Sequence, residues 1–231
     1  MRRILSAAVC AAVVGTSVAQ QDPQFTQYMF DRLSINPGSA GLQGNLCGTL
    51  IGRQQWTGFD GAPKTILFNF QTPLAKISSG AGLTVYADNH GQQKSTMLRL
   101  SYSDHKTIGV SKLGIGLYAG MTSRSLGNDW KAVDAPSSDD AIPDNGASAA
   151  GFDLGIGLFY LNPKFHIGIS STQLPETKLA AVSIQNARHY YLQAGFNWDI
   201  LGDKKYVLKP STLVKSDAAS TQFDFNVTLL Y

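Results

Sequence analysis

The sequence predicts an all-β protein, an antiparallel transmembrane β-barrel, and three observations lead to this fold class. Apolar residues alternate with small or polar residues in runs of about nine or ten, the length that a tilted strand needs to cross a hydrocarbon core. After residue 19, no apolar stretch reaches the ~18 residues of a transmembrane helix. Only 15% of the residues are charged, against roughly 25% in soluble domains. A closed barrel satisfies all three observations, and a soluble β-sandwich is the alternative.

The first residues have the layout of a secretory signal peptide. Arg2 and Arg3 precede an apolar run at residues 4–14, and small residues follow, with cleavage expected after Ala19. Cys10 lies inside the apolar run and not at the cleavage point, which argues against a lipoprotein signal. We therefore expect export to the cell outer membrane.

Three regions follow from this interpretation. Residues 1–19 are assigned to the signal peptide, residues 20–45 to an N-terminal periplasmic plug or lid segment, and residues 46–231 to the outer-membrane barrel. Cys47 is the only cysteine after residue 19, so no intrachain disulfide can form. Removal of two of the 19 basic residues leaves 17 against 16 acidic residues, and this nearly neutral balance argues against a nucleic-acid partner.

Residues 20–45 differ from the barrel region because polar residues, aromatic residues and prolines are mixed without alternation. A short helix is expected from Pro23 to Arg32, with Asp22 as its N-cap, followed by a turn at residues 36–38. A plug or lid is favoured over a loose tail, because three aromatic side chains need a surface to cover them, namely Phe25, Tyr28 and Phe30.

The barrel region contains about ten predicted strands. Leu113 and Ile115, for example, share one face of a strand, while Gly114 and Gly116 lie on the other. The same alternation defines strands at residues 46–56, 64–72, 79–88, 96–104, 111–121, 152–160, 165–171, 189–198, 206–214 and 221–231.

The connections between these strands alternate in length. The longest are residues 122–151 and 172–188, and the shortest is an Asn-Pro-Lys turn at residues 162–164. Outer-membrane barrels have short periplasmic turns and longer outside loops. Both long connections are therefore expected outside the cell, with the Asn-Pro-Lys turn in the periplasm.

Two motifs resemble a known family. The first is Q-D-P-Q-F-T-Q-Y-M-F at residues 21–30, followed by I-N-P-G-S-A-G at residues 35–41. The second is R-Q-Q-W-T-G-F-D-G-A-P-K-T at residues 53–65. Together, directly after a signal peptide, they resemble the PorP/SprF family of type IX secretion and gliding proteins. The resemblance continues more weakly through residues 82–88, 113–120 and 209–215.

This resemblance implies an outer-membrane β-barrel that has no catalysis or cofactor and works beside type IX secretion components. It implies a secreted partner with a C-terminal sorting domain, such as a large adhesin. The barrel would bind this partner and help its secretion or surface attachment. Family barrels have several more strands than the set predicted here, so we expect a shortened form, short by nature or by truncation. Outer-membrane lipids are the remaining expected partner.

The two motifs supply the candidate interaction residues, and a purely structural role for them is equally compatible with the sequence. Arg53 or Gln54 must face the lumen, because a charge facing lipid costs about 2–4 kcal/mol at mid-bilayer. Gly58, Gly61 and Pro63 are expected to shape the first outside turn. The candidate residues are Asp22, Pro23, Phe25, Gln27, Tyr28, Phe30, Asn36, Pro37, Arg53, Gln55, Trp56, Gly58, Phe59 and Pro63.

The sequence contains no motif that is typical of a catalytic or metal-binding site. None of His90, His105, His166 and His189 has a partner at metal-ligand spacing, and the first two are interpreted as solvated loop residues. No G-x-S-x-G motif occurs, so the chain is not expected to be an enzyme. Five aspartates in residues 122–151 would suit calcium but fit no EF-hand spacing, so a surface loop that contacts a partner is favoured.

A small passive outer-membrane channel is the alternative function. Glycines at inward positions, such as Gly114 and Gly116, would leave space for a pore. A steady conductance in planar bilayers would favour this channel over a plugged accessory barrel.

Overall fold

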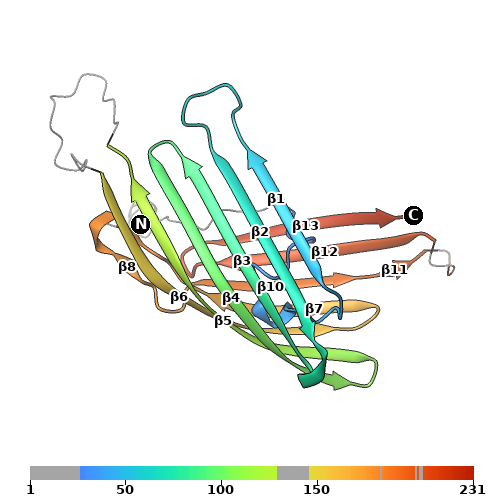
Figure 1. The fold of residues 1–231 in the computed structure, drawn as a ribbon. Coiled ribbons are helices and arrows are strands. Elements are labelled where there is room, and N and C mark those ends of the chain that lie inside the picture. The colour runs from blue at the N-terminus through green and yellow to red at the C-terminus, as the bar shows by residue number, and fades with distance from the viewer. Residues whose placement is uncertain (1–26, 129–145, 183, 201, 203–204) are drawn as a thin grey trace, which may run out of the picture.

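The computed structural model describes residues 27–128, 146–182, 184–200, 202 and 205–231, and most of them belong to one antiparallel sheet of eleven strands (Figure 1). The sheet order is β1-β2-β3-β4-β5-β6-β7-β10-β12-β11, with β13 on the other edge of β12. The strands of this sheet are β1 Cys47–Gln54, β2 Lys64–Leu74, β3 Ser79–His90, β4 Gln93–Ile108, β5 Ser111–Leu126, β6 Ala147–Leu161, β7 Phe165–Thr172, β10 His189–Phe196, β11 Trp198–Asp199, β12 Val207–Ser216 and β13 Thr221–Leu230. A separate two-stranded hairpin pairs β8 Lys178–Leu179 with β9 Ile184–Gln185.

All ten predicted strands are present, and three of them are much longer than predicted. β4 and β5 have 16 residues each and β6 has 15. The apolar alternation that predicts a strand stops before the pairing does. Lys94 of β4, for example, still pairs with Ser125 of β5. Backbone hydrogen bonds do not require apolar side chains, so the ladder continues through polar strand ends that the sequence pattern leaves out.

The two faces of the sheet have opposite character, and the apolar face is the exposed one. On β5, Leu117 is 55% exposed whereas its neighbour Tyr118 is 2% exposed. On β4, Leu98 and Leu100 are exposed while Arg99 is buried. A soluble sandwich would bury its apolar face and expose its polar one. The observed arrangement is that of a membrane barrel wall, apolar outside and polar inside.

Aromatic rings lying over glycines of the neighbouring strand fix the register of the inner face. Gly155 pairs with Tyr118 across β5 and β6, and a Cβ on Gly155 would come within 2.2 Å of the Tyr118 ring. Gly168 accommodates the ring of Phe159 between β6 and β7 in the same way. A slip by one residue would turn these rings outward, so the pairs specify the register.

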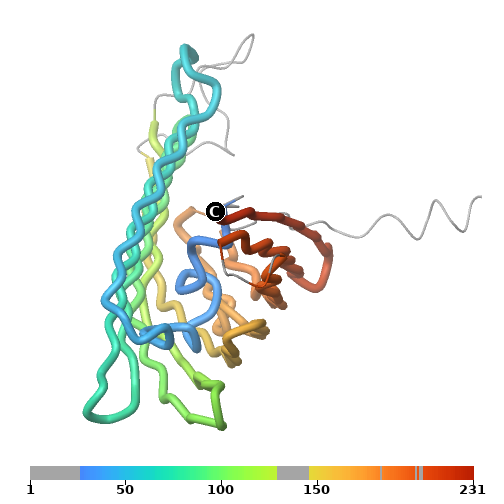
Figure 2. Tube along the Cα trace, turned by 90° about the vertical axis from the view of Figure 1, so that its right-hand side faces the viewer, coloured from blue at the N-terminus to red at the C-terminus, as the bar shows by residue number. Residues whose placement is uncertain are grey.

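The sheet curves strongly but does not close among the described residues, because β1 and β13 are not paired with each other. Figure 2 shows the N-terminal segment in blue between the β1 side of the sheet and the C-terminal strands in red. β1 and β2, β5 and β6, and β7 and β10 are each connected at the same end of the sheet, which we call the long-loop end. The 162–164 turn lies at the opposite, short-turn end. The two long connections therefore share one end, as predicted.

Helical structure in the described residues is confined to three 3-10 turns, η1 Pro37–Ser39, η2 Ala75–Ile77 and η3 Ala180–Val182. The helix predicted from Pro23 to Arg32 is wrong for its described part, residues 27–32, and its beginning lies outside the described residues. Bonds from Phe30 N to Gln27 O and from Asp31 N to Tyr28 O close turns there instead. Within the described part of the chain, no helix is long and apolar enough to cross a membrane.

Candidate functional site

The interior of the curved sheet is occupied by residues 27–46, which we call the inner segment. Figure 2 shows this segment in blue inside the curved sheet. Hydrogen bonds join it to β2, β4, β7 and β12 of the wall. These bonds run from Ser103 Oγ to Gly38 O at 3.0 Å, His105 Nε2 to Ala40 O at 2.9 Å, Ser170 Oγ to Ile35 O at 2.8 Å, Gly41 N to Gln71 Oε1 at 3.0 Å, and between Tyr28 and Ser211 hydroxyls at 3.2 Å. The contact partners lie 30 to 183 residues away in sequence, so the segment is held by the tertiary fold.

Asn36 is the central anchor of the inner segment, and its side chain is fully buried. Its Nδ2 donates to Leu158 O at 3.0 Å and to Ile169 O at 3.1 Å, bridging β6 and β7. Its Oδ1 accepts from Gly38 N at 2.9 Å, which caps the η1 turn. One amide therefore joins the segment's own turn to two strands, using both donors and the acceptor.

Glycines of the wall are where the inner segment touches the sheet. A Cβ on Gly114 would lie 2.0 Å from Gly38 O, and one on Gly116 would lie 2.3 Å from the carbonyl carbon of Pro37. Both contacts are with backbone, which cannot move aside as a flexible side chain can. From the sequence, these inward glycines were expected to leave space for a pore. The structure fills that space with the inner segment.

A buried ion pair crosses the inner face beside the segment. Arg99 Nε and Nη2 each lie 2.6 Å from Asp153 Oδ2, and both side chains are almost completely buried. Tyr118 donates to Asp153 Oδ1 at 2.8 Å, and the Arg99 guanidinium lies 4.5 Å from the centre of the Tyr118 ring. Gly120 of β5 pairs with Arg99 of β4 on one side and with Asp153 of β6 on the other. Because glycine has no side chain, nothing on β5 blocks the contact between the two charged residues. Removal of one partner would leave an uncompensated buried charge.

Asp31 brings a second carboxylate into the interior, on the inner segment itself. It accepts from the backbone N of Ser34 at 3.2 Å, from the Ser34 hydroxyl and from Asn69 Nδ2. Burial raises the pKa of Asp31 above its usual range, against the hydrogen bonds from Ser34 and the positive charge of Arg99, which lower it. The residue therefore ties the inner segment to β2 in a pH-dependent way.

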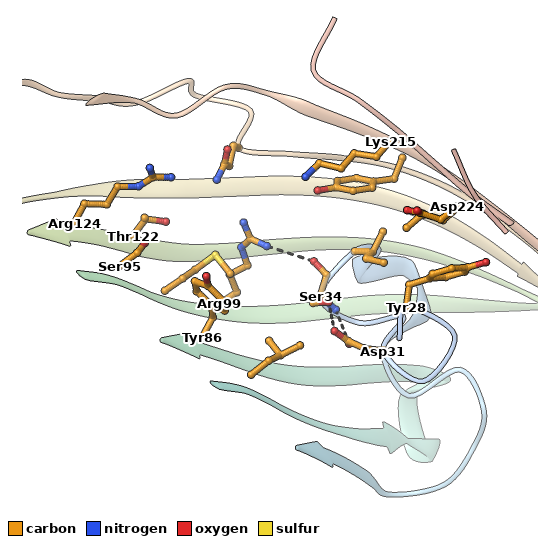
Figure 3. A pocket seen from close by; sticks show the side chains of 16 residues that line it. Tyr28, Asp31, Ser34, Tyr86, Ser95, Arg99, Thr122, Arg124, Lys215 and Asp224 are labelled. Atoms are coloured by element: carbon orange, nitrogen blue, oxygen red, sulfur yellow. Dashed lines mark hydrogen bonds between the residues drawn. The ribbon is translucent and has the colours of Figure 1, made fainter. Parts of the chain in front are cut away.

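A cavity of about 80 Å³ lies between the inner segment and the long-loop end (Figure 3). Asp31 and Ser34 form its floor, and side chains from several strands form its walls, among them Arg124 and Thr122 of β5 and Lys215 of β12. The mixture of cationic, hydroxyl and apolar groups distinguishes this cavity from the exposed outer face of the sheet.

The second motif forms a hairpin tip at the long-loop end between β1 and β2. Trp56 is 71% exposed and Phe59 76% exposed. Gly58 and Gly61 have φ angles of +103° and +74°, which explains glycine at both turn positions and fits the predicted role in this turn. Gly61 O accepts from Gly91 N at 2.8 Å, so the tip is braced by the neighbouring β3–β4 turn.

The structure does not join the two motifs into one site. Tyr28, Asn36 and Pro37 are buried in the interior, whereas Gln27 and Phe30 are exposed and Phe30 therefore lacks the expected cover. Asp22, Pro23 and Phe25 lie outside the described residues. Arg53, Gln55, Trp56, Phe59 and Pro63 instead line a groove at the hairpin, with Asp88 and His90. Arg53 stands in register with the buried Thr65, on the lumen side as predicted.

Some polar interior residues were missed by the sequence analysis or misassigned. His105 was interpreted as a solvated loop residue. It is half-buried on β4 and contacts the inner segment at Ala40 O, so that interpretation is wrong. Arg99, Asp153 and Arg124 were not singled out. A signal for them existed, because each is a charged residue at an inward position of a period-two strand, where a lipid-facing charge would be costly.

The five aspartates at residues 129–144, which belong to the loop expected to contact a partner, lie outside the described residues. Within the part of the chain that the structure describes, no three His, Cys, Asp or Glu side chains are grouped so that they could hold a metal ion. The site that the structure does describe is therefore built from hydrogen bonds, ion pairs and exposed aromatic residues.

Comparison with known proteins identifies the family. Residues 17–231 match the family model described as type IX secretion system membrane protein PorP/SprF. No curated protein matches significantly. Among solved structures, the crystal structure of BamA from Haemophilus ducreyi lacking POTRA domains 1-3 is similar with a TM-score of 0.40 and 13% identity, over 66% of this chain and 32% of that chain. The chain thus spans about a third of that structure. Because the family model covers almost the whole sequence, the chain belongs to the PorP/SprF family of type IX secretion system membrane proteins.

Proposed function

We propose that this membrane protein is an outer-membrane barrel of the type IX secretion or gliding machinery. It binds a cognate secreted protein with a C-terminal sorting domain, such as a large adhesin, and helps its secretion or surface attachment. The long-loop end faces the cell exterior and residues 1–19 are removed as a signal peptide. Residues 20–45 act as the plug or lid, and neither a cofactor nor a catalytic step is part of the function.

The observation that carries this proposal is the occupied interior. Asn36 is fully buried between β6 and β7, and the backbone of the inner segment lies directly on wall glycines such as Gly116. Such a curved sheet with an occupied interior is a rigid scaffold that presents loops, and binding residues are often found on loops held by a rigid scaffold. A role in holding a partner follows more directly from this arrangement than a role in conduction.

The hairpin tip at residues 55–63 is the proposed contact for the sorting domain. Trp56 and Phe59 are large, exposed aromatic side chains of the kind that dominates binding energy at protein interfaces. They project from a turn that is braced through Gly61 and Gly91, so little ordering is needed when a partner binds. The adjoining groove carries Arg53, which adds a charged contact at the rim.

A pull-down from outer membranes tests this proposal. The tagged chain is solubilised in detergent, and the proteins that accompany it are identified by mass spectrometry. We expect a secreted protein with a sorting domain, together with type IX secretion components. The double variant Trp56→Ala/Phe59→Ala should recover much less of the secreted protein. Ile77→Ala, which removes an apolar residue that is 60% exposed at the short-turn end, should recover as much as the wild type. Absence of any sorting-domain protein from the wild-type sample would refute the proposal.

The alternative of a small passive channel makes a different prediction. Planar bilayers containing the purified chain should remain silent if the inner segment closes the lumen. A steady open conductance would favour the channel. The space that a channel needs is occupied by Pro37 and Gly38 against Gly114 and Gly116, which argues against it.

A further inference from the structure

The cavity at the long-loop side of the inner segment contains a buried cation without a described partner. Arg124 of β5 is only 7% exposed, and its Nε has no hydrogen-bond partner. No ion pair to Arg124 occurs among the described residues. A guanidinium removed from water without an anion is costly, so this position is expected to receive one.

Two acidic residues line the cavity, Asp31 and Asp224, and both accept hydrogen bonds from other residues. Asp31 accepts from Ser34 and Asn69, and Asp224 accepts from Gln222. Two further acidic residues on the neighbouring strands are engaged as well. Asp88 shares the register row of Arg124 through Ser95, but it accepts from Thr65 at 2.6 Å and pairs with His90 at 2.9 Å. Asp153 is held by Arg99. None of these acidic residues forms an ion pair with Arg124 among the described residues.

A second unsatisfied polar group lies beside Arg124 on the same face of β5. Thr122 is 3% exposed, and its Oγ1 has no hydrogen-bond partner. Residues two apart on a strand are separated by about 7 Å, so a small anion seated between them can accept from both side chains. Figure 3 shows Thr122 and Arg124 together at the end of the cavity away from Ser34 and Asp31.

The remaining lining of the cavity indicates the chemical class of the ligand. Leu67, Met97 and Leu213 add apolar surface to the cavity. A volume of about 80 Å³ admits a small group such as a carboxylate with part of an adjoining side chain, but no folded domain. Peptides combine a carboxylate with a neighbouring apolar side chain, whereas free phosphate has no apolar part.

We infer that Arg124 and Thr122 form a subsite for one carboxylate of a peptide segment, with Arg124 as the charged contact and Thr122 as the second donor. The carboxylate belongs to an acidic side chain or to a chain's C-terminus. The identity of that peptide as part of the secreted partner rests on the proposed function. Lys215 lines the same cavity from β12.

Titration of the purified full chain in detergent with small probes tests this inference. The probes are N-acetyl-leucine, its neutral amide, N-acetyl-aspartate amide and inorganic phosphate, and saturation-transfer NMR measures their dissociation constants. We expect at least one carboxylate peptide probe to bind and the neutral leucine amide not to bind. Tighter binding of N-acetyl-leucine indicates a C-terminal carboxylate, and tighter binding of N-acetyl-aspartate amide indicates an acidic side chain.

Variants then assign the subsite. Arg124→Gln should weaken the carboxylate probes by about tenfold or more, because a charge-assisted hydrogen bond is lost. The isosteric Thr122→Val should weaken them by a smaller factor. Lys94→Gln is the matched control. Lys94 pairs with Ser125, the residue that follows Arg124, but it is exposed, so the change removes one positive charge outside the cavity. Each variant is accepted only if its thermal unfolding remains cooperative.

Three results would overturn the inference: equal binding of acid and amide, unchanged affinity in Arg124→Gln, or phosphate binding tighter than either carboxylate probe. The outcome is separate from that of the pull-down. Probe binding without capture of a sorting-domain protein would refute the proposed function and leave the subsite standing. Capture of such a protein without probe binding would refute the subsite alone.

Discussion

Truncation of the Asn36 side chain is the sharpest perturbation of the occupied interior. Asn36→Ala removes the two side-chain hydrogen bonds from Asn36 to β6 and β7, together with the bond that caps the η1 turn, while the wall itself keeps its residues. The carbonyls of Leu158 and Ile169 also belong to residues paired within the sheet, so the ladder between these strands should remain. The change therefore acts on docking of the inner segment and much less on the sheet.

The expected magnitude follows from the bonds that are lost. Asn36 forms hydrogen bonds at 3.0, 3.1 and 2.9 Å, and its side chain is fully buried. At about 1 kcal/mol net for each bond, loss of the two bonds to the wall and of the cap should favour the undocked, open form of the η1 turn by about 3 kcal/mol. This corresponds to an increase of about a hundredfold in the population of chains whose inner segment is undocked.

Two assays report that population. Hydrogen exchange at the amides of Ser39 and Ala40, which bond to Asn36 O and Pro37 O, should accelerate by about a hundredfold. Cys47 is a free thiol in a cavity bounded by Ser39, so its maleimide labelling should also become faster. Asn45→Ala is the matched control, because Asn45 is exposed on the same segment.

The reasoning is refuted if Asn36→Ala exchanges these amides at the wild-type rate while the sheet stays folded. It is also refuted if Asn45→Ala accelerates exchange to the same extent. Either result would mean that the hydrogen bonds of Asn36 do not hold the segment in place.

Three further predictions concern the interior. Gly116→Val should displace the segment and raise the labelling rate of Cys47, whereas Gly52→Val, where a Cβ meets nothing within 4 Å, should leave it unchanged. Arg99→Met or Asp153→Leu alone should destabilise the fold by about 3–5 kcal/mol, and the double variant by less than the sum, as measured by thermal unfolding in detergent. Because burial raises the pKa of Asp31, its contribution to docking is full below the ordinary value of 3.8 and is lost as pH rises through the raised value. The protection factor of the Ser39 amide should therefore fall over that range in the wild type and stay level in Asp31→Asn.

The strands were predictable because lipid and lumen impose opposite requirements on alternate residues. Leu117 and Tyr118 show this directly, one exposed and one buried on adjacent positions. Strand lengths were less predictable, since pairs such as Lys94 with Ser125 carry no apolar alternation. The prediction placed β8 and β9 inside a loop and included Trp198 of β11 in the strand at residues 189–198, because two-residue strands are too short to show a period.

The interior was the part that sequence reasoning could not place. Gly114 and Gly116 were recognised as inward glycines, but nothing local to that strand shows that residues more than 70 positions earlier lie on them. The predicted helix over Pro23–Arg32 relied on local capping signals. Tertiary contacts of Tyr28 and Asp31 with β12 and β2 hold the described part of that segment in turns instead. Long-range hydrogen bonds of this kind leave no periodic trace in a sequence.

The central claim is that the long-loop end holds a secreted partner, and crosslinking in intact cells tests it most directly. A photoreactive phenylalanine analogue replaces Phe59 at the hairpin tip, and the same analogue at Ile77 serves as the control at the short-turn end. The account predicts a covalent adduct between position 59 and a secreted protein with a C-terminal sorting domain, and none from position 77. Equal adducts from both positions, or no sorting-domain protein at position 59, would contradict it.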